Sequence, residues 1–247
     1  MPGTLAPMQY RAHATAALFL AVALSPWYSA AYPRDRAEQP ASACSARLDD
    51  LKRAMSARRL DATENALQAA EKICVSPTND ERQRLATAEV AFGKVIYPQQ
   101  PEQALAHFRT ASTLEPDNLN TALSVSAALI QIHKYTEALV ILDAALARNP
   151  DDRDLLFKLE YNAGFAWLNI CVADHHCDIT KPEAHFQRAI ELNPDFPDSY
   201  EGLAAIVHDR RHDCARATAL YKQACDHGLE RSCVQYRWFT SKDACRK

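Results

Sequence analysis

The chain has 247 residues, with 28 Lys and Arg side chains against 31 Asp and Glu side chains, which gives a formal net charge of −3 at pH 7. A weakly acidic chain has no general attraction for nucleic acid or for an anionic membrane surface, so the composition argues against both as partners. The glycines never cluster, the closest two being Gly202 and Gly228, which excludes the glycine-rich loops that cradle phosphates.

Residues 1–31 have the pattern of a secretory signal peptide. Arg11 precedes the uncharged run ATAALFLAVAL, and the helix-breaking segment SPWYSAAY follows it. This run of 11 residues is shorter than the roughly 20 that a membrane helix needs, so we expect cleavage rather than membrane insertion. The mature chain should begin near Tyr32. Abundant alanine and arginine are typical of a bacterium of high genomic GC content, which favours the periplasm over secretion.

All eight cysteines follow this segment, and an oxidising compartment favours disulfides between them. After a flexible linker at 32–43, apolar residues at helical spacing predict two helices between Cys44 and Cys74. Two helices of similar length joined by a short turn bring their outer ends together, so these two cysteines should pair. A lipidated Cys44 is the competing interpretation, but the charged stretch RDRAEQ separates it from the apolar run.

The centre of the chain repeats itself. PEQALAHFRTASTLEPDN from Pro101 aligns with YTEALVILDAALARNPDD from Tyr135 at an offset of 34 residues, and KPEAHFQRAIELNPDF is a third copy. Between the second and third copies Pro150 and Pro194 are 44 residues apart, so that repeat contains ten extra residues. Small residues at helical spacing, followed by a proline, predict a helix that packs closely against its neighbours and ends at the proline.

This repeat resembles the tetratricopeptide repeat family, whose unit is a 34-residue pair of antiparallel helices, over about residues 85–228. The resemblance implies an all-α fold, an α-solenoid of antiparallel helix pairs. On the first helices, YNAGFAW from Tyr161 and YEGLA from Tyr200 match the family, while Gly93 lies one place out of register. The matching positions of the second helices are Ala104, Phe108, Ala111 and Pro116; Tyr135, Ala138, Leu142, Ala145 and Pro150; Phe186, Ala189 and Pro194; and Ala217, Tyr221 and Ala224.

The ten extra residues include ICVADHHCDIT at 170–180, which we place at a turn between two helices. We interpret Cys171 and Cys177 as a disulfide that closes a small loop. A zinc site made by these thiols with His175 or His176 is one alternative, although an oxidising compartment removes the thiolates that zinc requires. A redox-active pair is another, but the spacing is not Cys-x-x-Cys.

The C-terminal part is predicted to form a second helical hairpin closed by disulfides, here called a stapled hairpin like the one at 44–74. Cys214 and Cys225 lie on one expected helix and Cys233 and Cys245 on the next. Folding these helices together pairs Cys225 with Cys233 at the turn and Cys214 with Cys245 at the open end. The stretch QACDHGLERSC also resembles the cysteine-rich helical repeat proteins of bacterial envelopes. The predicted organisation is a signal peptide at 1–31, a linker at 32–43 and one helical repeat domain at 44–247, with stapled hairpins at 44–74 and 214–247 around repeats at 85–228.

The first helices of such a solenoid line a concave groove that suits extended segments of other proteins. An apolar centre with acidic flanks favours a peptide or helix with hydrophobic anchors and some positive charge. Leu123 and Phe165 could instead be core residues, whereas the amphipathic ring of Tyr161 tolerates partial exposure. The lysine and asparagine set that clamps C-terminal carboxylates in some family members is absent. The expected groove residues are Glu89, Leu123, Ala127, Tyr161, Phe165 and Glu201.

No catalytic residue, cofactor or resident metal is predicted, since neither Gly-x-Ser-x-Gly nor His-Glu-x-x-His occurs. His208 and His212 have the spacing of helical metal ligands, with Cys214 nearby, but we expect His212 in a turn. The sequence therefore predicts a non-catalytic module that binds or scaffolds a protein or peptide partner in the cell envelope. The main alternative is a small-molecule or metal-binding accessory protein that uses the loop from Cys171 to Cys177.

Overall fold

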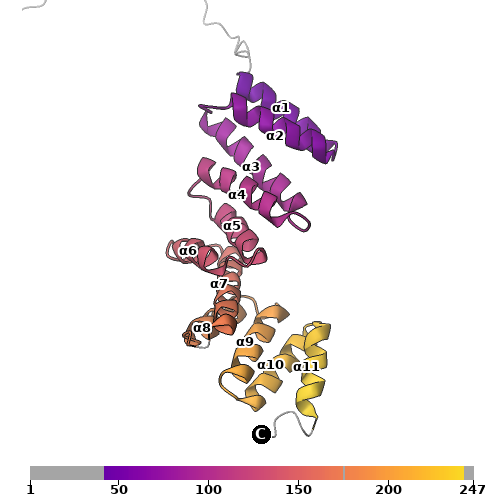
Figure 1. Cartoon of the computed structure of the whole chain (residues 1–247), viewed down its shortest axis with the longest axis vertical. Coiled ribbons are helices and arrows are strands. Elements are labelled where there is room, and N and C mark those ends of the chain that lie inside the picture. The colour runs from indigo at the N-terminus through magenta and orange to yellow at the C-terminus, as the bar shows by residue number, and fades with distance from the viewer. Residues whose placement is uncertain (1–41, 175, 242–247) are drawn as a thin grey trace, which may run out of the picture. The chain divides into compact units, whose positions relative to one another are not determined.

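The computed structural model describes residues 42–174 and 176–241. The predicted signal peptide, most of the linker, His175 and Cys245 lie outside these residues. The described ranges contain helices and no strand, so the prediction of an all-α fold is confirmed (Figure 1). The helices are α1 (Ala43–Ser56), α2 (Leu60–Ile73), α3 (Asn79–Ile96), α4 (Pro101–Leu114), α5 (Leu119–Gln131), α6 (Tyr135–Leu146), α7 (Arg153–Ala173), α8 (Thr180–Leu192), α9 (Pro197–Asp209), α10 (Cys214–Asp226) and α11 (Glu230–Thr240).

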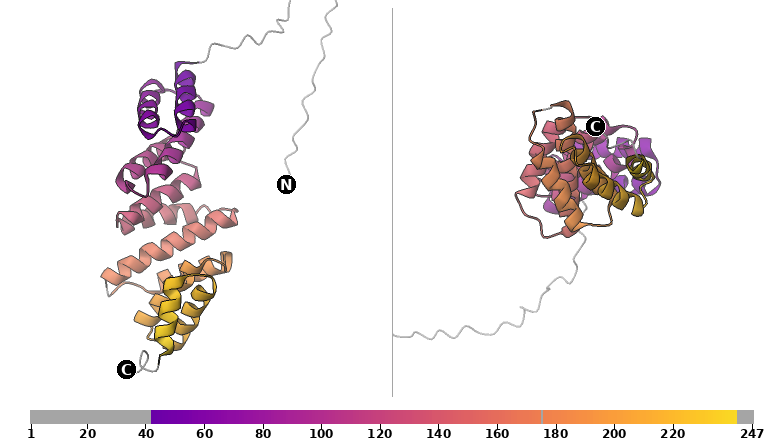
Figure 2. Two further views of the ribbon diagram at one scale, coloured as in Figure 1. Left: turned by 90° about the vertical axis from the view of Figure 1, so that its right-hand side faces the viewer. Right: turned by 90° about the horizontal axis from the view of Figure 1, so that it is seen from below.

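Helices that follow one another in the sequence also lie side by side in space (Figures 1 and 2). Each helix packs extensively against the next along the chain except that α2 touches α3 only slightly, and further contacts join α1 to α3, α5 to α7 and α7 to α9. The odd-numbered helices are therefore the first helices of successive pairs, and the even-numbered helices are the second. This arrangement is the stack of helix pairs that a solenoid requires.

Local sequence signals set where the helices begin and end. Thr78 and Glu81 form a reciprocal capping box at the start of α3, with each side chain accepting from the other residue's backbone N–H. Asp152 accepts hydrogen bonds from two backbone N–H groups at the start of α7. Beyond α5 and α6, His133 and Asn149 adopt positive φ angles of 61° and 47°, which stop the helical path before the next turn.

Small residues allow the close packing that the repeat predicts. Ala104, Ala111 and Ala138 are completely buried, and Ala104 and Ala138 belong to the first of two apolar clusters. In the same way Phe186 fills the second cluster against α9, where a Cβ on Gly202 would collide with its ring. Residues of α7 belong to both clusters, so this helix links the N-terminal repeats to the C-terminal ones.

The ten extra residues extend a helix more than they lengthen a loop. α7 has 21 residues and continues to Ala173, so the ICVA part of the expected loop is helical. Cys171 is buried on this extension, and the connection to α8 is confined to residues 174–179. The prediction that Cys171 lies in a protruding loop is therefore wrong, because the apolar residues Ile170 and Cys171 pack inward as a further turn of α7.

Three disulfides among the described residues have the partners expected from the sequence. Cys214 is also disulfide-bonded, and its expected partner, Cys245, lies outside the described residues. The Cα–Cα distances are 4.9 Å for Cys44–Cys74, 5.2 Å for Cys171–Cys177 and 4.6 Å for Cys225–Cys233.

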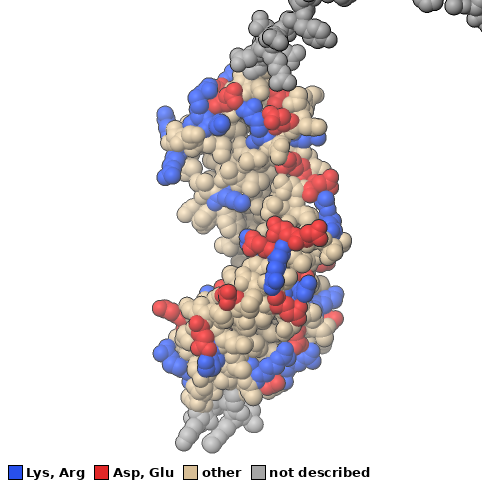
Figure 3. All heavy atoms as spheres, turned by 180° about the vertical axis from the view of Figure 1, so that it is seen from behind, with Lys and Arg blue, Asp and Glu red and all other residues tan. Residues whose placement is uncertain are grey.

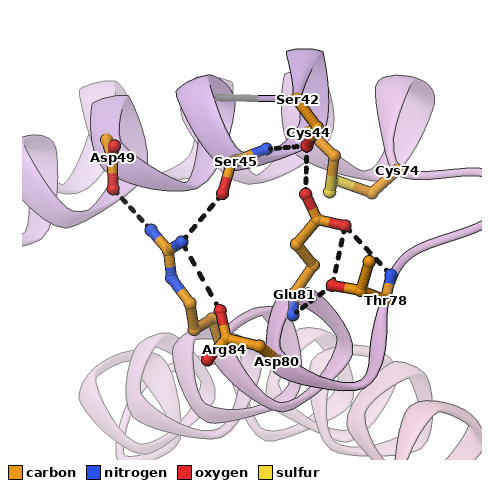
Figure 4. The surroundings of a disulfide bond; sticks show 9 residues. All are labelled: Ser42, Cys44, Ser45, Asp49, Cys74, Thr78, Asp80, Glu81 and Arg84. Carbon is orange, nitrogen blue, oxygen red and sulfur yellow. Dashed lines mark hydrogen bonds and ion pairs between the residues drawn. A yellow bond between two sulfur atoms is a disulfide. The ribbon is translucent and has the colours of Figure 1, made fainter. Parts of the chain in front are cut away.

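The N-terminal hairpin is held to the repeats by polar contacts beside its disulfide (Figure 4). Ser42 donates a hydrogen bond to the buried carboxylate of Glu81, and this bond is the main reason that the pKa of Glu81 is lowered. Arg84 on α3 reaches across to α1, where it bonds Asp49 at 2.5 Å and Ser45 at 3.2 Å. These contacts place α1 directly beside α3.

Candidate partner-binding face

A row of aromatic side chains runs from the core to the surface on one side of α7. Phe157, Tyr161 and Phe165 follow one another at intervals of one helical turn. Phe157 is buried, Tyr161 is half-buried and Phe165 is 36% exposed. The Tyr161 ring packs edge-on against Phe196, with 4.9 Å between ring centroids, and lies 6.3 Å from the Phe165 ring. Phe165 therefore presents apolar surface to solvent, and its ring lies next to that of Tyr161, which is fixed by its contact with Phe196.

Two carboxylates flank this aromatic row from the next first helix. Asp198 and Glu201 lie on α9, and both accept hydrogen bonds from the Arg231 guanidinium of α11. The Nε–Oε2 distance to Glu201 is 2.7 Å, and Ser232 donates to the second oxygen of Glu201 at 3.0 Å. The Glu201 carboxylate is thus fixed by two partners and already holds a guanidinium.

Burial raises the pKa of Tyr161 to about 12, and the nearby charges of Asp198 and Glu201 act in the same direction. Arg231 opposes them by favouring the phenolate. Tyr161 is therefore a neutral phenol near pH 7, which can donate a hydrogen bond but is a poor base or nucleophile.

α5 adds partly exposed apolar surface next to α7. Leu123 and Ala127 are half-buried, and Leu123 packs against the first apolar cluster. The Tyr97 hydroxyl donates to the Ala127 carbonyl oxygen at 3.2 Å, which ties α5 to the end of α3. The face defined by Leu123, Ala127, Tyr161, Phe165 and Glu201 is called the first-helix face below.

Glu89 does not belong to this face, so its prediction as a groove residue is wrong. The side chain is 0% exposed, and its Oε2 lies 2.7 Å from His107 Nδ1 on α4. It points between α3 and α4 because it lies one turn before Gly93, on the side of α3 that packs against Phe108 of α4. A carboxylate in this position contributes to the fold and cannot contact a partner.

Glu89 instead belongs to a paired motif that sequence reasoning missed. Glu160 on α7 makes the same contact with His185 on α8, again at 2.7 Å. Each glutamate lies four residues before a glycine of its own helix, and each histidine precedes the phenylalanine that packs on that glycine in an Ala-His-Phe sequence. Aligning Gly93 with Gly164 would have found the motif.

The charge state of His107 follows from its surroundings. The hydrogen bond that His107 donates to Glu89 raises the pKa of His107, and the charges of Glu89, Glu71 and Glu64 add to this, while burial opposes it. The pKa of Glu71 is raised as well. Burial is the larger cause and repulsion from Glu89 is the second. An imidazolium between carboxylates is the arrangement that these shifts favour.

The residues that the sequence offers as metal ligands make other contacts in the described part of the chain. The sulfurs of Cys171 and Cys177 are joined to each other, so they are not thiolate ligands. His208 bonds Asp209 and packs on Phe239, and His212 lies in the turn after α9 with a φ of 55°. No cluster of three or more potential metal ligands occurs within 42–174 and 176–241, and no helix there has the length and apolarity to cross a membrane.

Comparisons with known proteins agree with this geometry. The family model for the tetratricopeptide repeat matches residues 97–159. Residues 97–159, from the end of α3 into α7, are thus similar to tetratricopeptide repeats, as the sequence predicts, and the described helices form an α-solenoid. No curated protein sequence matches the chain.

Solved structures show the same fold at low sequence identity. MamA from residue 41 onward, from Desulfovibrio magneticus RS-1, is 18% identical with a TM-score of 0.55, covering 76% of this chain and 96% of that one. YrrB, described as a TPR protein with an unusual peptide-binding site, is 16% identical with a TM-score of 0.58, covering 77% and 90%. PilF from Pseudomonas aeruginosa is 16% identical with a TM-score of 0.53, covering 80% and 87%.

Proposed function

We propose that this chain is an exported, non-catalytic module that binds a protein partner in the cell envelope through its first-helix face. The observation that carries the proposal is the aromatic row on α7, where Phe165 is partly exposed next to Tyr161, and Tyr161 in turn lies near the charges of Asp198 and Glu201. Tetratricopeptide repeats generally act as protein-binding or scaffolding modules, which supports this class of function.

The chemistry of the face favours a partner segment with an apolar anchor and a basic residue. An aromatic surface held in place by a half-buried tyrosine offers an anchor site at low cost in conformational entropy. Asp198 and Glu201 carry two negative charges against the single positive charge of Arg231, so this part of the face remains negative and favours a basic residue of the partner. YrrB is described as peptide-binding, which is consistent with a peptide segment as the ligand of such a fold.

Two features of the sequence support export. The first 31 residues have the pattern of a cleavable signal, and the described cysteines are in disulfides, which are typical of oxidising compartments. Sequencing the N-terminus of the protein isolated from its own cells tests this part of the proposal. A mature chain that begins near Tyr32 is expected, and a cytosolic chain that retains Met1 would contradict export.

Partner binding is tested with two matched substitutions of exposed apolar residues. Phe165→Glu places a charge on the first-helix face, and Val140→Glu places the same charge on α6, a second helix, where Val140 is 65% exposed. Both variants should keep the helical circular dichroism of the wild type. When the tagged proteins are isolated from envelope extracts, Phe165→Glu should lose a discrete partner that the wild type and Val140→Glu retain. Equal recovery with both variants would refute a role for this face.

A further inference from the structure

A second candidate binding surface lies at the other end of the described chain, between α1 and α3. A groove of about 740 Å³ runs between these two helices. Its α1 side is formed by Leu48, Leu51 and Met55, which follow one face of the helix, and its α3 side by Thr87 and Ala88. The floor is apolar and the groove is open to solvent along its length, so it can take several apolar side chains of a ligand.

The groove continues along α3 toward α5. Thr87 also lines a smaller cavity of about 260 Å³ that is bounded by α3 and the start of α5. The two cavities meet at Thr87 on α3, and the smaller one is lined by both Lys94 and Glu115, so the groove between the packed helices α1 and α3 is the part whose shape and charge suit a third helix. A single amphipathic helix would place apolar side chains into this groove at intervals of three and four residues.

The charged side chains that line the groove between α1 and α3 are basic. These side chains are Lys52 on α1 and Arg84 on α3. Arg84 already donates hydrogen bonds to Asp49 and Ser45. The Lys52 ammonium makes no hydrogen bond or ion pair with any residue in the described ranges, and it is exposed. Arg58 and Arg59, in the turn that follows α1, add two more exposed cations.

Figure 3 shows basic side chains at the edge of the molecule where α1 and α2 are joined. A ligand that follows the groove to this end meets three cations with no ion-pair partner among the described residues, Lys52, Arg58 and Arg59. Carboxylates on the ligand would satisfy them, whereas lysines would be repelled.

We propose that this groove binds an acidic amphipathic helix of a partner protein. The apolar face of the helix packs on Leu48, Met55 and Ala88, and its carboxylates lie near Lys52 and the turn that contains Arg58. Met55 suits such a contact because its flexible side chain adapts to different apolar shapes. The proposal does not depend on the first-helix face, which favours a basic partner segment. Together the two surfaces would let one chain hold two ligands of opposite charge, as a scaffold does.

The test uses two synthetic helical peptides with identical leucine positions, one with glutamate and one with lysine at the remaining positions. Binding to the disulfide-bonded mature protein is measured by fluorescence anisotropy at low and at physiological ionic strength. The glutamate peptide should bind about tenfold or more tightly than the lysine peptide, because one carries charges complementary to the groove and the other carries like charges. This preference should shrink as salt is added.

Three variants locate the binding site. Lys52→Glu should weaken binding of the glutamate peptide about tenfold, since an attraction becomes a repulsion. Lys72→Glu is the matched control, because Lys72 is an exposed lysine on α2 of the same hairpin and should leave binding unchanged. Thr87→Trp fills the groove from an exposed position and should abolish binding while the helical circular dichroism stays that of the wild type.

Several results would overturn the proposal. Equal affinities for the two peptides, wild-type binding by Thr87→Trp, or equal losses with Lys52→Glu and Lys72→Glu would each do so. If the glutamate peptide fails but anionic lipid vesicles bind in a manner that needs Lys52, the occupant is a lipid surface. If the protein self-associates and Thr87→Trp abolishes this, the occupant is a second copy of the chain. None of these results depends on Phe165, so they are distinct from failure of the proposed function.

Discussion

The buried pair of Glu89 and His107 gives a prediction whose size and sign both follow from the structure. Replacing His107 with alanine leaves the carboxylate of Glu89 at 0% exposure without its hydrogen-bond partner at 2.7 Å. The second oxygen of Glu89 is buried and makes no hydrogen bond, and His107 is the only ion-pair partner of this carboxylate among the described residues. Breaking a buried ion pair in this way costs about 3 kcal/mol or more of unfolding free energy.

The loss should depend on pH in one direction. Hydrogen bonding to Glu89 raises the pKa of His107 above its ordinary value of 6.5, with Glu71 and Glu64 of α2 adding to the effect. The folded protein therefore holds this proton more tightly than the unfolded chain does. The stabilisation is fully present below about pH 6.5 and is lost as the pH rises through the pKa of the folded state. The difference between wild type and His107→Ala should accordingly shrink above pH 6.5.

Urea unfolding followed by far-UV circular dichroism, with the disulfides kept intact, measures this free energy across a series of pH values. His185→Ala is the matched control, since its partner Glu160 is 15% exposed and can be hydrated when the histidine is removed. We expect a smaller loss, of about 1 kcal/mol, for that variant. The reasoning is refuted if His107→Ala is as stable as the wild type near pH 6, or if the difference between them grows with pH.

Three further predictions concern packing, a disulfide and a tyrosine. Gly202→Ala should lower the unfolding free energy by about 1–3 kcal/mol in thermal or urea unfolding, because the added methyl group collides with the buried ring of Phe186. The double variant Cys44→Ser, Cys74→Ser opens a loop with a sequence separation of 30, should lose about 3 kcal/mol, and should show faster amide exchange in α1 and α2. In a spectrophotometric titration Tyr161 should ionise near pH 12, because burial raises its pKa, and Tyr161→Phe should reduce the absorbance change there. The fold loses the corresponding stability as the pH rises from 10 toward 12.

Much of the fold could be predicted because the repeat encodes it locally. Alanines such as Ala104 and Ala138 recur at the positions where two helices approach closely, and they are completely buried. The pairing of Cys44 with Cys74 follows from the equal lengths of two helices, which the spacing of apolar residues makes visible. In both cases residues close in sequence determine the contact.

The candidate sites were harder to predict, because they depend on how each helix is rotated. Glu89 and Tyr161 were expected on the same face, but α3 turns its glutamate inward to His107 while α7 leaves Tyr161 half-buried. A rotation of one residue, about a quarter of a helical turn, decides between these outcomes. The groove between α1 and α3 was not predicted, since it needs the docking of Arg84 onto Asp49, two residues far apart in the chain.

The central claim is that the first helices, and not the second, meet a protein partner. The most direct test places a photo-crosslinking amino acid at Phe165 on α7 or Ala127 on α5, and at Glu137 on α6 or Arg188 on α8 as controls, in cells that make the protein at its natural level. The account predicts that the first-helix probes capture the same discrete protein, which the second-helix probes do not. Equal capture from both sets of helices, or no captured protein from any probe, would contradict it.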